Sequence, residues 1–134
     1  MTIRFSAFAA GLAAVVLASQ GALARDLSFN VSAGKRTLVS SFAMYDSENC
    51  TFGAIPTGKL VTPPGNGKVE ILEERRVVNG DNCGKIQGWA RNVYYTPRPG
   101  FRGTDTIRVD FQYNKFTDAP ALTTATDNIT LIVK

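Results

Sequence analysis

Apolar side chains recur at every second position through much of this chain, and this alternation constrains the fold more than any other feature. In Thr106–Tyr113, apolar residues occupy positions 107, 109, 111 and 113, and polar residues fill the positions between them. Successive side chains of a β-strand point to opposite faces of a sheet, so the pattern predicts a strand with one buried face. No segment after residue 24 shows an apolar stripe with the helical period of about 3.6 residues. The sequence therefore predicts an all-β protein.

Other strands are expected where similar runs are bounded by turn residues. The expected strands are Leu27–Val31, Thr37–Tyr45, Thr51–Ile55, Lys59–Thr62, Lys68–Val78, Cys83–Tyr95, Thr106–Tyr113 and Asn128–Val133. Asn79–Asn82 is expected to turn a hairpin, because Asn-Gly accepts the positive φ angles of a tight turn. About seven short strands with frequent turns predict an antiparallel β-sandwich, with a small barrel as the alternative.

Residues 1–24 have the composition of a secretory signal peptide. Arg4 supplies a positive charge, an apolar run follows, and Ala22 and Ala24 are the small residues that precede a cleavage site. The apolar run is short for a membrane anchor, which is the less favoured interpretation. We expect cleavage after Ala24, a single domain over residues 25–134 without a transmembrane segment, and a periplasmic or secreted location.

The two cysteines, Cys50 and Cys83, are expected to form one structural disulfide in an exported chain. Closing a loop of this length would contribute roughly 3–4 kcal/mol in the chain-entropy account. A reactive thiol pair is the alternative, but it would need a Cys-x-x-Cys spacing or an electropositive helix start. Neither is present in the sequence.

The absence of histidine excludes Ser-His-Asp triads, Cys–His pairs and imidazole metal ligands. Glu73 and Glu74 are adjacent, and adjacent side chains on a strand face opposite sides, so they cannot act as an acid–base pair. The acidic residues near the cysteines have no metal-binding spacing; they are Asp46, Glu48 and Asp81. We therefore expect no catalytic, cofactor-binding or metal-binding residue and no cofactor.

The charged and aromatic residues indicate which kind of partner the protein could bind. The formal net charge is +4, and the basic and acidic residues are interleaved, which is typical of a solvated face and does not indicate nucleic-acid binding. Trp89 and Tyr94 lie five residues apart, so one of them is expected outside the core. An exposed ring beside Arg91 or Arg98 would suit a glycan or a protein partner, while ordinary core packing is the alternative. These four residues form the candidate binding surface.

Turn-forming residues are concentrated in Tyr94–Ile107. Pro99-Gly100 suits the two central positions of a type II turn, and Phe101 can close the end of a sandwich. Gly103 allows a second bend, and Asp105 is expected to cap the backbone amides of that bend.

This segment, with its pattern Y-x-P-x-P-G-F-x-G-x-D-x-I, resembles the bacterial immunoglobulin-like and cadherin-like domains. The upstream segment Pro63–Val69 is similar to their P-x-x-G-x-V element. The resemblance implies an immunoglobulin-like sandwich in which Pro99, Gly100, Phe101, Gly103 and Asp105 hold a structural turn. The calcium ligands of the cadherin type are not recognisable, so the resemblance implies neither calcium binding nor adhesion.

Together these features predict an exported, non-enzymatic, immunoglobulin-like binding module of the bacterial envelope. Its partner would be an unidentified protein or glycan, contacted through the loops Tyr45–Asn49, Asn79–Asn82 and Lys115–Ala121. The alternative is a small periplasmic inhibitor of a lysozyme or protease. A glycosidase that uses carboxylates alone is a third hypothesis, and it would need two carboxyl groups about 5–10 Å apart in a cleft.

Overall fold

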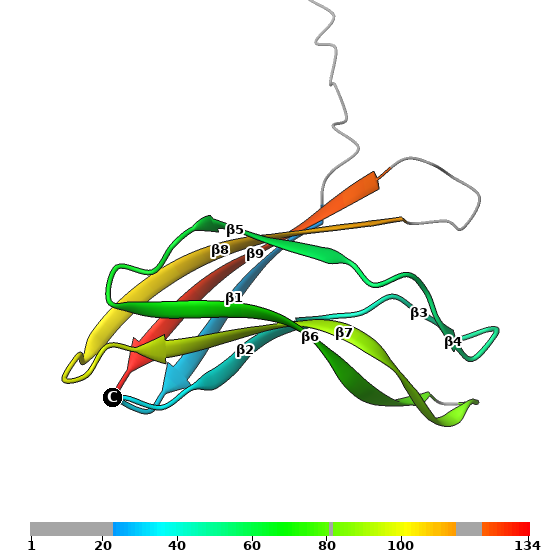
Figure 1. The fold of residues 1–134 in the computed structure, drawn as a ribbon, viewed down its shortest axis with the longest axis horizontal. Helices are drawn as coiled ribbons and strands as arrows, with labels where there is room; N and C mark the ends of the chain where they lie inside the picture. The colour runs from blue at the N-terminus through cyan, green and yellow to red at the C-terminus, as the bar shows by residue number, and fades with distance from the viewer. Residues whose placement is uncertain (1–22, 81, 115–121) are drawn as a thin grey trace, which may run out of the picture.

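A computed structural model describes residues 23–80, 82–114 and 122–134 (Figure 1). In these ranges the regular elements are nine strands, and none is a helix. The strands are β1 (Leu23–Val31), β2 (Thr37–Phe42), β3 (Tyr45–Asp46), β4 (Thr51–Phe52), β5 (Thr57–Thr62), β6 (Gly67–Gly80), β7 (Gly84–Pro97), β8 (Gly103–Asn114) and β9 (Leu122–Val133). The predicted all-β sandwich with one disulfide is confirmed, although two of the nine strands are very short.

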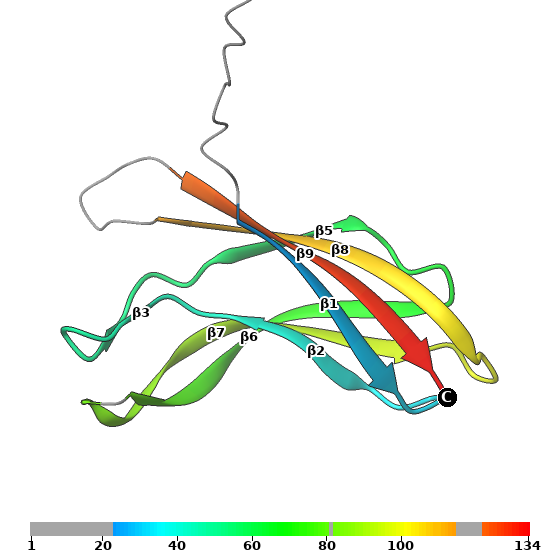
Figure 2. The ribbon, with the colours of Figure 1, turned by 180° about the vertical axis from the view of Figure 1, so that it is seen from behind.

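Two facing sheets build the sandwich. The first has the strand order β1-β9-β8-β5, the second has the order β2-β7-β6, and β3 pairs with β4 alone. Figure 2 shows β1 lying along β9 at the edge of the first sheet. These two strands run parallel, which departs from the fully antiparallel sandwich that we expected. The turn at Gly34 (φ +70°) carries the chain from β1 to β2 in the other sheet, so β1 and β2 do not form a hairpin and β1 pairs instead with the distant β9.

The hydrophobic core fills the space between the sheets. Its buried members on the first sheet are Val31, Ile107, Val109, Phe111, Ala125, Ile129, Leu131 and Val133, and those on the second are Val39, Val93 and Tyr95. Phe42 of β2 stacks on Phe111 of β8 with 5.0 Å between the ring centroids, so the two sheets meet through aromatic contact. We call this part of the molecule the body.

An ion pair between a partly exposed arginine and a buried carboxylate stabilises the body. The carboxylate of Asp127 on β9 is fully buried, and Arg25 on β1 donates two hydrogen bonds of 2.8 Å to it. The Ser40 hydroxyl on β2 donates a third, at 2.5 Å, so that this carboxylate joins both sheets. The hydrogen bond with Asp127 is the main cause of the raised pKa of Arg25.

The β6–β7 hairpin extends beyond the hydrophobic core of the body. Its ladder runs without interruption from Gly67↔Pro97 to Gly80↔Gly84. The position that we predicted for its turn is wrong, because Asn79 and Gly80 still belong to β6. The Cys83 amide donates to the Gly80 carbonyl at 3.2 Å, and Gly84 has the positive φ (+64°).

The far half of this hairpin projects beyond the core and forms the arm. We define the arm as Arg75–Gly80, Cys83–Trp89 and the β3–β4 hairpin, Tyr45–Phe52, that packs against them (Figure 1). The Cys50–Cys83 disulfide, with a Cα–Cα distance of 5.4 Å, ties the two hairpins together. None of the described residues of the arm is fully buried.

Two glycines of the arm are required by close packing. The Phe52 ring lies where a Cβ on Gly88 would be, and the Tyr45 hydroxyl lies where a Cβ on Gly80 would be. Any larger residue at either position would push the β3–β4 hairpin away. This contact explains why Gly80 is a strand residue rather than the turn residue that its Asn-Gly sequence suggests.

The first residues of two strands also differ from the predicted ones. Strand β9 begins at Leu122, six residues before the predicted start, and β1 begins at Leu23, inside the predicted signal peptide. The predicted loop Lys115–Ala121 lies outside the described residues.

Candidate functional site

Strand alternation separates the four residues of the predicted binding surface. Trp89 and Arg91 share the face of β7 that also carries the buried Val93, whereas Tyr94 lies on the opposite, outer face. Arg98 follows the end of β7, at the other end of the ladder from the arm. The four residues therefore occupy three separate environments.

Trp89 belongs to an exposed face of the arm. It lies directly opposite Arg75 on β6, whose guanidinium carbon is 5.1 Å from the ring centroid. Arg75 also donates to Gln87 at 3.5 Å, so it contacts two exposed side chains of β7. Trp89 is 42% exposed and Val77 is 54% exposed. We call Arg75, Val77, Gln87 and Trp89 the arm face.

Arg91 has a structural environment. Its Nε donates to the Pro56 carbonyl at 2.9 Å, and its guanidinium lies 3.4 Å from the Glu73 carboxylate. The side chain also packs against Gly58, where an added Cβ would meet it at 3.0 Å. Arg91 thus attaches β5 and the preceding segment to the second sheet.

Tyr94 takes part in a polar network on the outer face of the second sheet. Its hydroxyl donates to Glu74 at 2.5 Å, Asn92 donates to the same oxygen at 2.7 Å, and the Arg36 guanidinium stacks on the ring at 3.6 Å. The hydrogen bond from Tyr94 is the main reason that the pKa of Glu74 is lowered and that of Tyr94 is raised. Tyr94 is therefore held in place by its neighbours on both sides.

Two of the predicted binding loops meet at the tip of the arm. The disulfide joins the loop that follows Tyr45 to the hairpin end that follows Asn79. Asp46 accepts hydrogen bonds from the amides of Glu48 (2.9 Å) and Asn49 (3.2 Å), and from the Asn49 side chain at 2.6 Å. The side-chain bond from Asn49 is the main cause of the lowered pKa of Asp46. The described part of the tip is thus cross-linked and internally hydrogen-bonded, and Asp81 lies outside the described residues.

Asp105 has different partners from those that the sequence predicted. Instead of capping only its own bend, it accepts hydrogen bonds of 2.9 Å from the amides of Gly65 and Asn66, some 40 residues upstream. The Tyr95 hydroxyl and the Thr106 amide donate to it as well, both at 2.9 Å. Burial would raise the pKa of Asp105, but these four bonds together outweigh it and lower the pKa. Burial, followed by the bond to Asp105, raises the pKa of Tyr95.

The turn after β7 has the geometry of type II. The Phe101 amide donates to the Arg98 carbonyl at 3.1 Å, and Gly100 at the third position has φ +80°. The Arg98 amide donates to the Asn66 carbonyl at 2.8 Å, which joins this turn to the β5–β6 loop. Phe101 packs against the core from the end of the sandwich.

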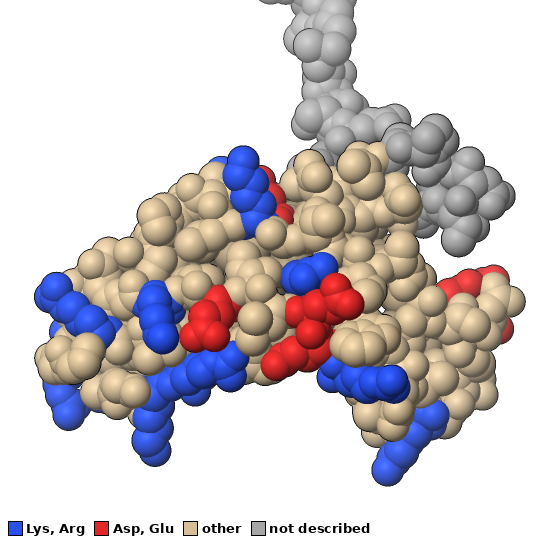
Figure 3. Space-filling model, in the orientation of Figure 1, with Lys and Arg blue, Asp and Glu red and all other residues tan. Residues whose placement is uncertain are grey.

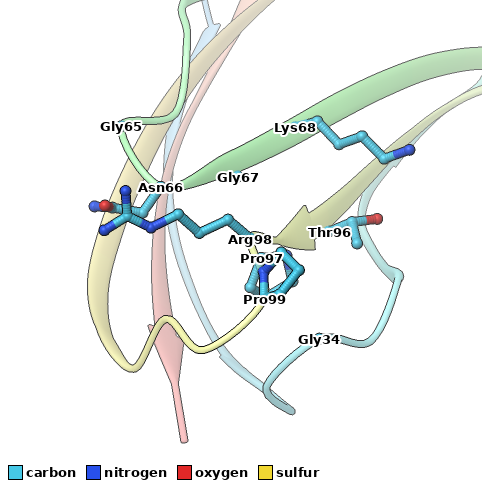
Figure 4. Close-up of a pocket in the computed structure, with 9 residues that line it drawn as sticks. All are labelled: Gly34, Gly65, Asn66, Gly67, Lys68, Thr96, Pro97, Arg98 and Pro99. Carbon is cyan, nitrogen blue, oxygen red and sulfur yellow. The ribbon is translucent and has the colours of Figure 1, made fainter.

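A groove of about 640 Å³ opens at this end of the body, and we call it the end groove (Figure 4). The β1–β2 turn, the β5–β6 loop and the end of β7 form its walls; the lining residues are Gly34, Gly65, Asn66, Gly67, Lys68, Thr96, Pro97, Arg98 and Pro99. Sequence reasoning named only Arg98 of this set as a binding residue. Its three segments are distant in the sequence, and no local pattern indicates that they meet.

Comparison of the chain with protein-family models, with curated proteins and with solved structures finds no match. Over the described residues, no group of three or more His, Cys, Asp or Glu side chains is placed to hold a metal ion. No helix in the same ranges is long and apolar enough to cross a membrane.

Proposed function

We propose that this chain is an exported, non-enzymatic binding module of the bacterial envelope and that it contacts its partner with the arm. The observation that carries the proposal is the exposure of Trp89 and Val77 on a projecting, cross-linked hairpin. Exposed tryptophan is the residue type most enriched at the energetic centres of protein interfaces. The partner is a protein or a glycan of the envelope.

Rigidity supports a binding role for the arm. A partner that binds a preorganised surface loses less conformational entropy than one that must order a loop. Here the disulfide, the Arg75 contact with Trp89 and the glycine–aromatic packing hold the arm face before any partner arrives. A disulfide is also typical of proteins in oxidising compartments, which agrees with export to the periplasm or beyond.

The two buried carboxylates have structural partners. Asp105 and Asp127 each accept at least three hydrogen bonds from protein groups, and both side chains are buried. A glycosidase would need its pair of carboxylates in a solvent-lined cleft. A binding role accounts better for these groups, which stabilise the scaffold.

The test compares capture by the purified protein and by two variants. Immobilised protein is exposed to native envelope extract and to a glycan array, and the bound species are quantified. We expect Trp89→Ala to reduce retention of a specific partner by about 30-fold, since a central aromatic contributes about 2 kcal/mol or more. Val61→Ser is the matched control, because Val61 is a comparably exposed apolar residue outside the arm. Equal retention by Trp89→Ala and the wild-type protein would contradict the proposal.

A hydrolase inhibitor remains the second candidate, and the tip of the arm is the feature that favours it. The loop from Asp46 to Cys50 projects, is internally hydrogen-bonded and ends in the disulfide, as a loop inserted into an active site would need to be. An inhibitor would abolish the activity of an envelope lysozyme or protease at a one-to-one ratio, and deletion of residues 47–49 would remove the effect. Absence of inhibition in such titrations would leave the general binding role alone.

A further inference from the structure

The end groove lies at the opposite end of the β6–β7 ladder from the arm face. Its volume, about 640 Å³, is within the range of roughly 300–1,000 Å³ that small-molecule sites occupy. Figure 4 shows Pro97 and Pro99 close together, with Lys68 and Arg98 extending to opposite sides of them. The groove thus has an apolar centre with a cation on each side.

Positive charge is concentrated around this groove. Figure 3 shows Lys and Arg side chains gathered toward the end of the molecule that carries the C-terminus in Figure 1, with acidic side chains nearer the middle. The basic residues on the lining segments, or directly beside them in the chain or the hydrogen-bond pattern, are Lys35, Arg36, Lys68, Arg98, Arg102 and Lys134. Of these residues, Lys68 and Arg98 line the groove itself, and cations at a concave site raise the local concentration of anions.

Acidic groups near the groove offset only part of this charge. Glu70 lies 3.6 Å from Arg36 and 3.7 Å from Lys68, so it is shared between two cations. Asp105 is buried, and it accepts hydrogen bonds from the amides of Gly65 and Asn66 in the β5–β6 loop. No acidic residue is among those that line the groove in the described part of the chain. The Arg98 guanidinium carbon lies 5.8 Å from the centroid of the Phe101 ring. Arg98 makes no ion pair among the described residues, so no carboxylate in that part of the chain competes with a ligand for its N–H groups.

The neutral groups of the lining indicate the rest of the ligand. Asn66 and Thr96 carry an amide and a hydroxyl, which can hydrogen-bond to alcohol groups. Pro97 is buried, so the exposed ring of Pro99 is the apolar surface that is open to C–H groups of a ligand. The glycines leave the walls without side chains. A sugar that carries a carboxylate matches these lining groups. Its hydroxyl groups can hydrogen-bond to Asn66 and Thr96, its apolar ring face can contact proline, and an arginine can bind its carboxylate with two hydrogen bonds.

We propose that the end groove is a binding site for an acidic saccharide with more than one carboxylate, in which Arg98 and Lys68 each bind a carboxylate and the exposed ring of Pro99 contacts the sugar. This site is additional to the arm face and does not depend on it. One domain would then contact an acidic glycan at one end and its other partner at the opposite end.

The probe for the test is a trimer of galacturonic acid, and its neutral control is a galactose trisaccharide of the same length. Binding to the ¹⁵N-labelled, disulfide-bonded protein is followed by NMR and calorimetry. We expect the acidic trimer alone to shift the amide signals of Gly65, Gly67 and Thr96. Arg98→Ala and Lys68→Ala should each weaken its binding by about tenfold, the size of one lost charge-assisted contact.

Matched variants separate a built site from general attraction to a basic protein. Lys85→Ala removes one positive charge from the arm outside the arm face and should leave binding of the trimer unchanged. If Lys85→Ala weakens binding as much as Arg98→Ala, or if the neutral trisaccharide binds equally well, the proposal is wrong. Absence of any shift with the acidic trimer would also overturn it. Thermal unfolding of each variant establishes that the fold is retained, and Lys68→Gln replaces Lys68→Ala if the latter unfolds.

Discussion

The body and the arm share one uninterrupted β-ladder but are stabilised by different means. In the body, β6 and β7 pack against a second sheet, and side chains such as Val93 and Tyr95 are completely buried. In the arm the same two strands are packed only against the short β3–β4 hairpin, and Val77 and Trp89 are about half exposed. A disulfide and two aromatic–glycine contacts replace the core there.

The difference shows that a strand pair can extend well beyond its core when it is clamped locally. An isolated two-stranded hairpin is marginally stable in water, so the arm needs the β3–β4 hairpin and the disulfide to remain ordered. Destabilising substitutions in the body should therefore lower the stability of the whole domain. Destabilising substitutions in the arm should mainly increase local opening of the arm. The following variants test this distinction.

The largest effect is expected for Arg25→Met in the body. The substitution leaves the fully buried Asp127 carboxylate with Ser40 as its remaining donor among the described residues. Because the Arg25 side chain is 41% exposed, the loss should lie toward the lower end of the roughly 3–5 kcal/mol that breaking a fully buried ion pair costs. Urea unfolding should show this loss as a single cooperative transition. Arg25→Lys keeps the charge but loses the paired geometry, and its effect should be intermediate. A loss below about 1 kcal/mol for Arg25→Met would show that the pair contributes little.

The next largest effect is expected when Cys50 and Cys83 are both replaced by Ser. The free energy of unfolding should fall by roughly 2–4 kcal/mol, because the unfolded chain gains entropy. Hydrogen exchange at Val78 and Ile86 in the arm should accelerate more than exchange at Val93 and Ile107 in the body. Equal acceleration at all four amides would contradict the separation of body and arm.

A smaller, pH-dependent effect is expected for Asp105. Its pKa is lowered in the folded protein, so the unfolded chain binds more protons in acid. The stability that this carboxylate contributes is complete above the ordinary Asp pKa of about 4 and is lost as the pH falls through the folded value. Asp105→Asn should therefore reduce stability at pH 7 by about 1–3 kcal/mol and flatten the acid limb of the stability profile.

Asp46→Asn is the matched control in the arm. The pKa of Asp46 is also lowered, but this carboxylate is exposed and its partners lie in its own loop. Urea unfolding at several pH values should thus show little change in global stability for this variant. A change as large as that for Asp105→Asn would contradict the comparison.

The smallest effect is expected for Tyr45→Phe, and it should be favourable. The Tyr45 hydroxyl is buried against Gly80 and has no hydrogen-bond partner among the described residues. Removing an unsatisfied buried polar group should raise the stability of the arm by up to about 1 kcal/mol, measured by hydrogen exchange at Val78. Gly80→Ala should act in the opposite direction, and Tyr45→Phe should relieve part of that loss in the double variant. Destabilisation by Tyr45→Phe alone would indicate that the hydroxyl has a partner.

The features that could be predicted from the sequence are those that depend on local pattern. The alternation in Thr106–Tyr113 predicts β8 because the polarity of each residue indicates whether its side chain lies on the buried or the exposed face of the sheet. The disulfide is predictable because two cysteines allow one pairing. The all-β class follows from the same local signals, repeated along the chain.

The features that could not be predicted depend on contacts between distant segments. Asp105 looks like a local cap in the sequence, and only the folded chain brings Gly65 and Asn66 to it. Asp127 is 102 residues from Arg25, and nothing near either residue indicates the pair. Asn79-Gly80 is a strong turn signal, but packing of Tyr45 on Gly80 places that glycine in the strand.

The parallel ladder of β1 has a consequence for the maturation of the chain. Leu23 and Ala24 are paired with Ala125 and Thr126, so the bond expected to be cut lies within a hydrogen-bonded strand. Processing enzymes act on accessible, unpaired backbone. If the chain is cleaved after Ala24 as the sequence predicts, cleavage must therefore precede the docking of β1 on β9, because a completed sheet would conceal the cleavage site. The timing of translocation relative to folding would then decide whether the leader is removed at all.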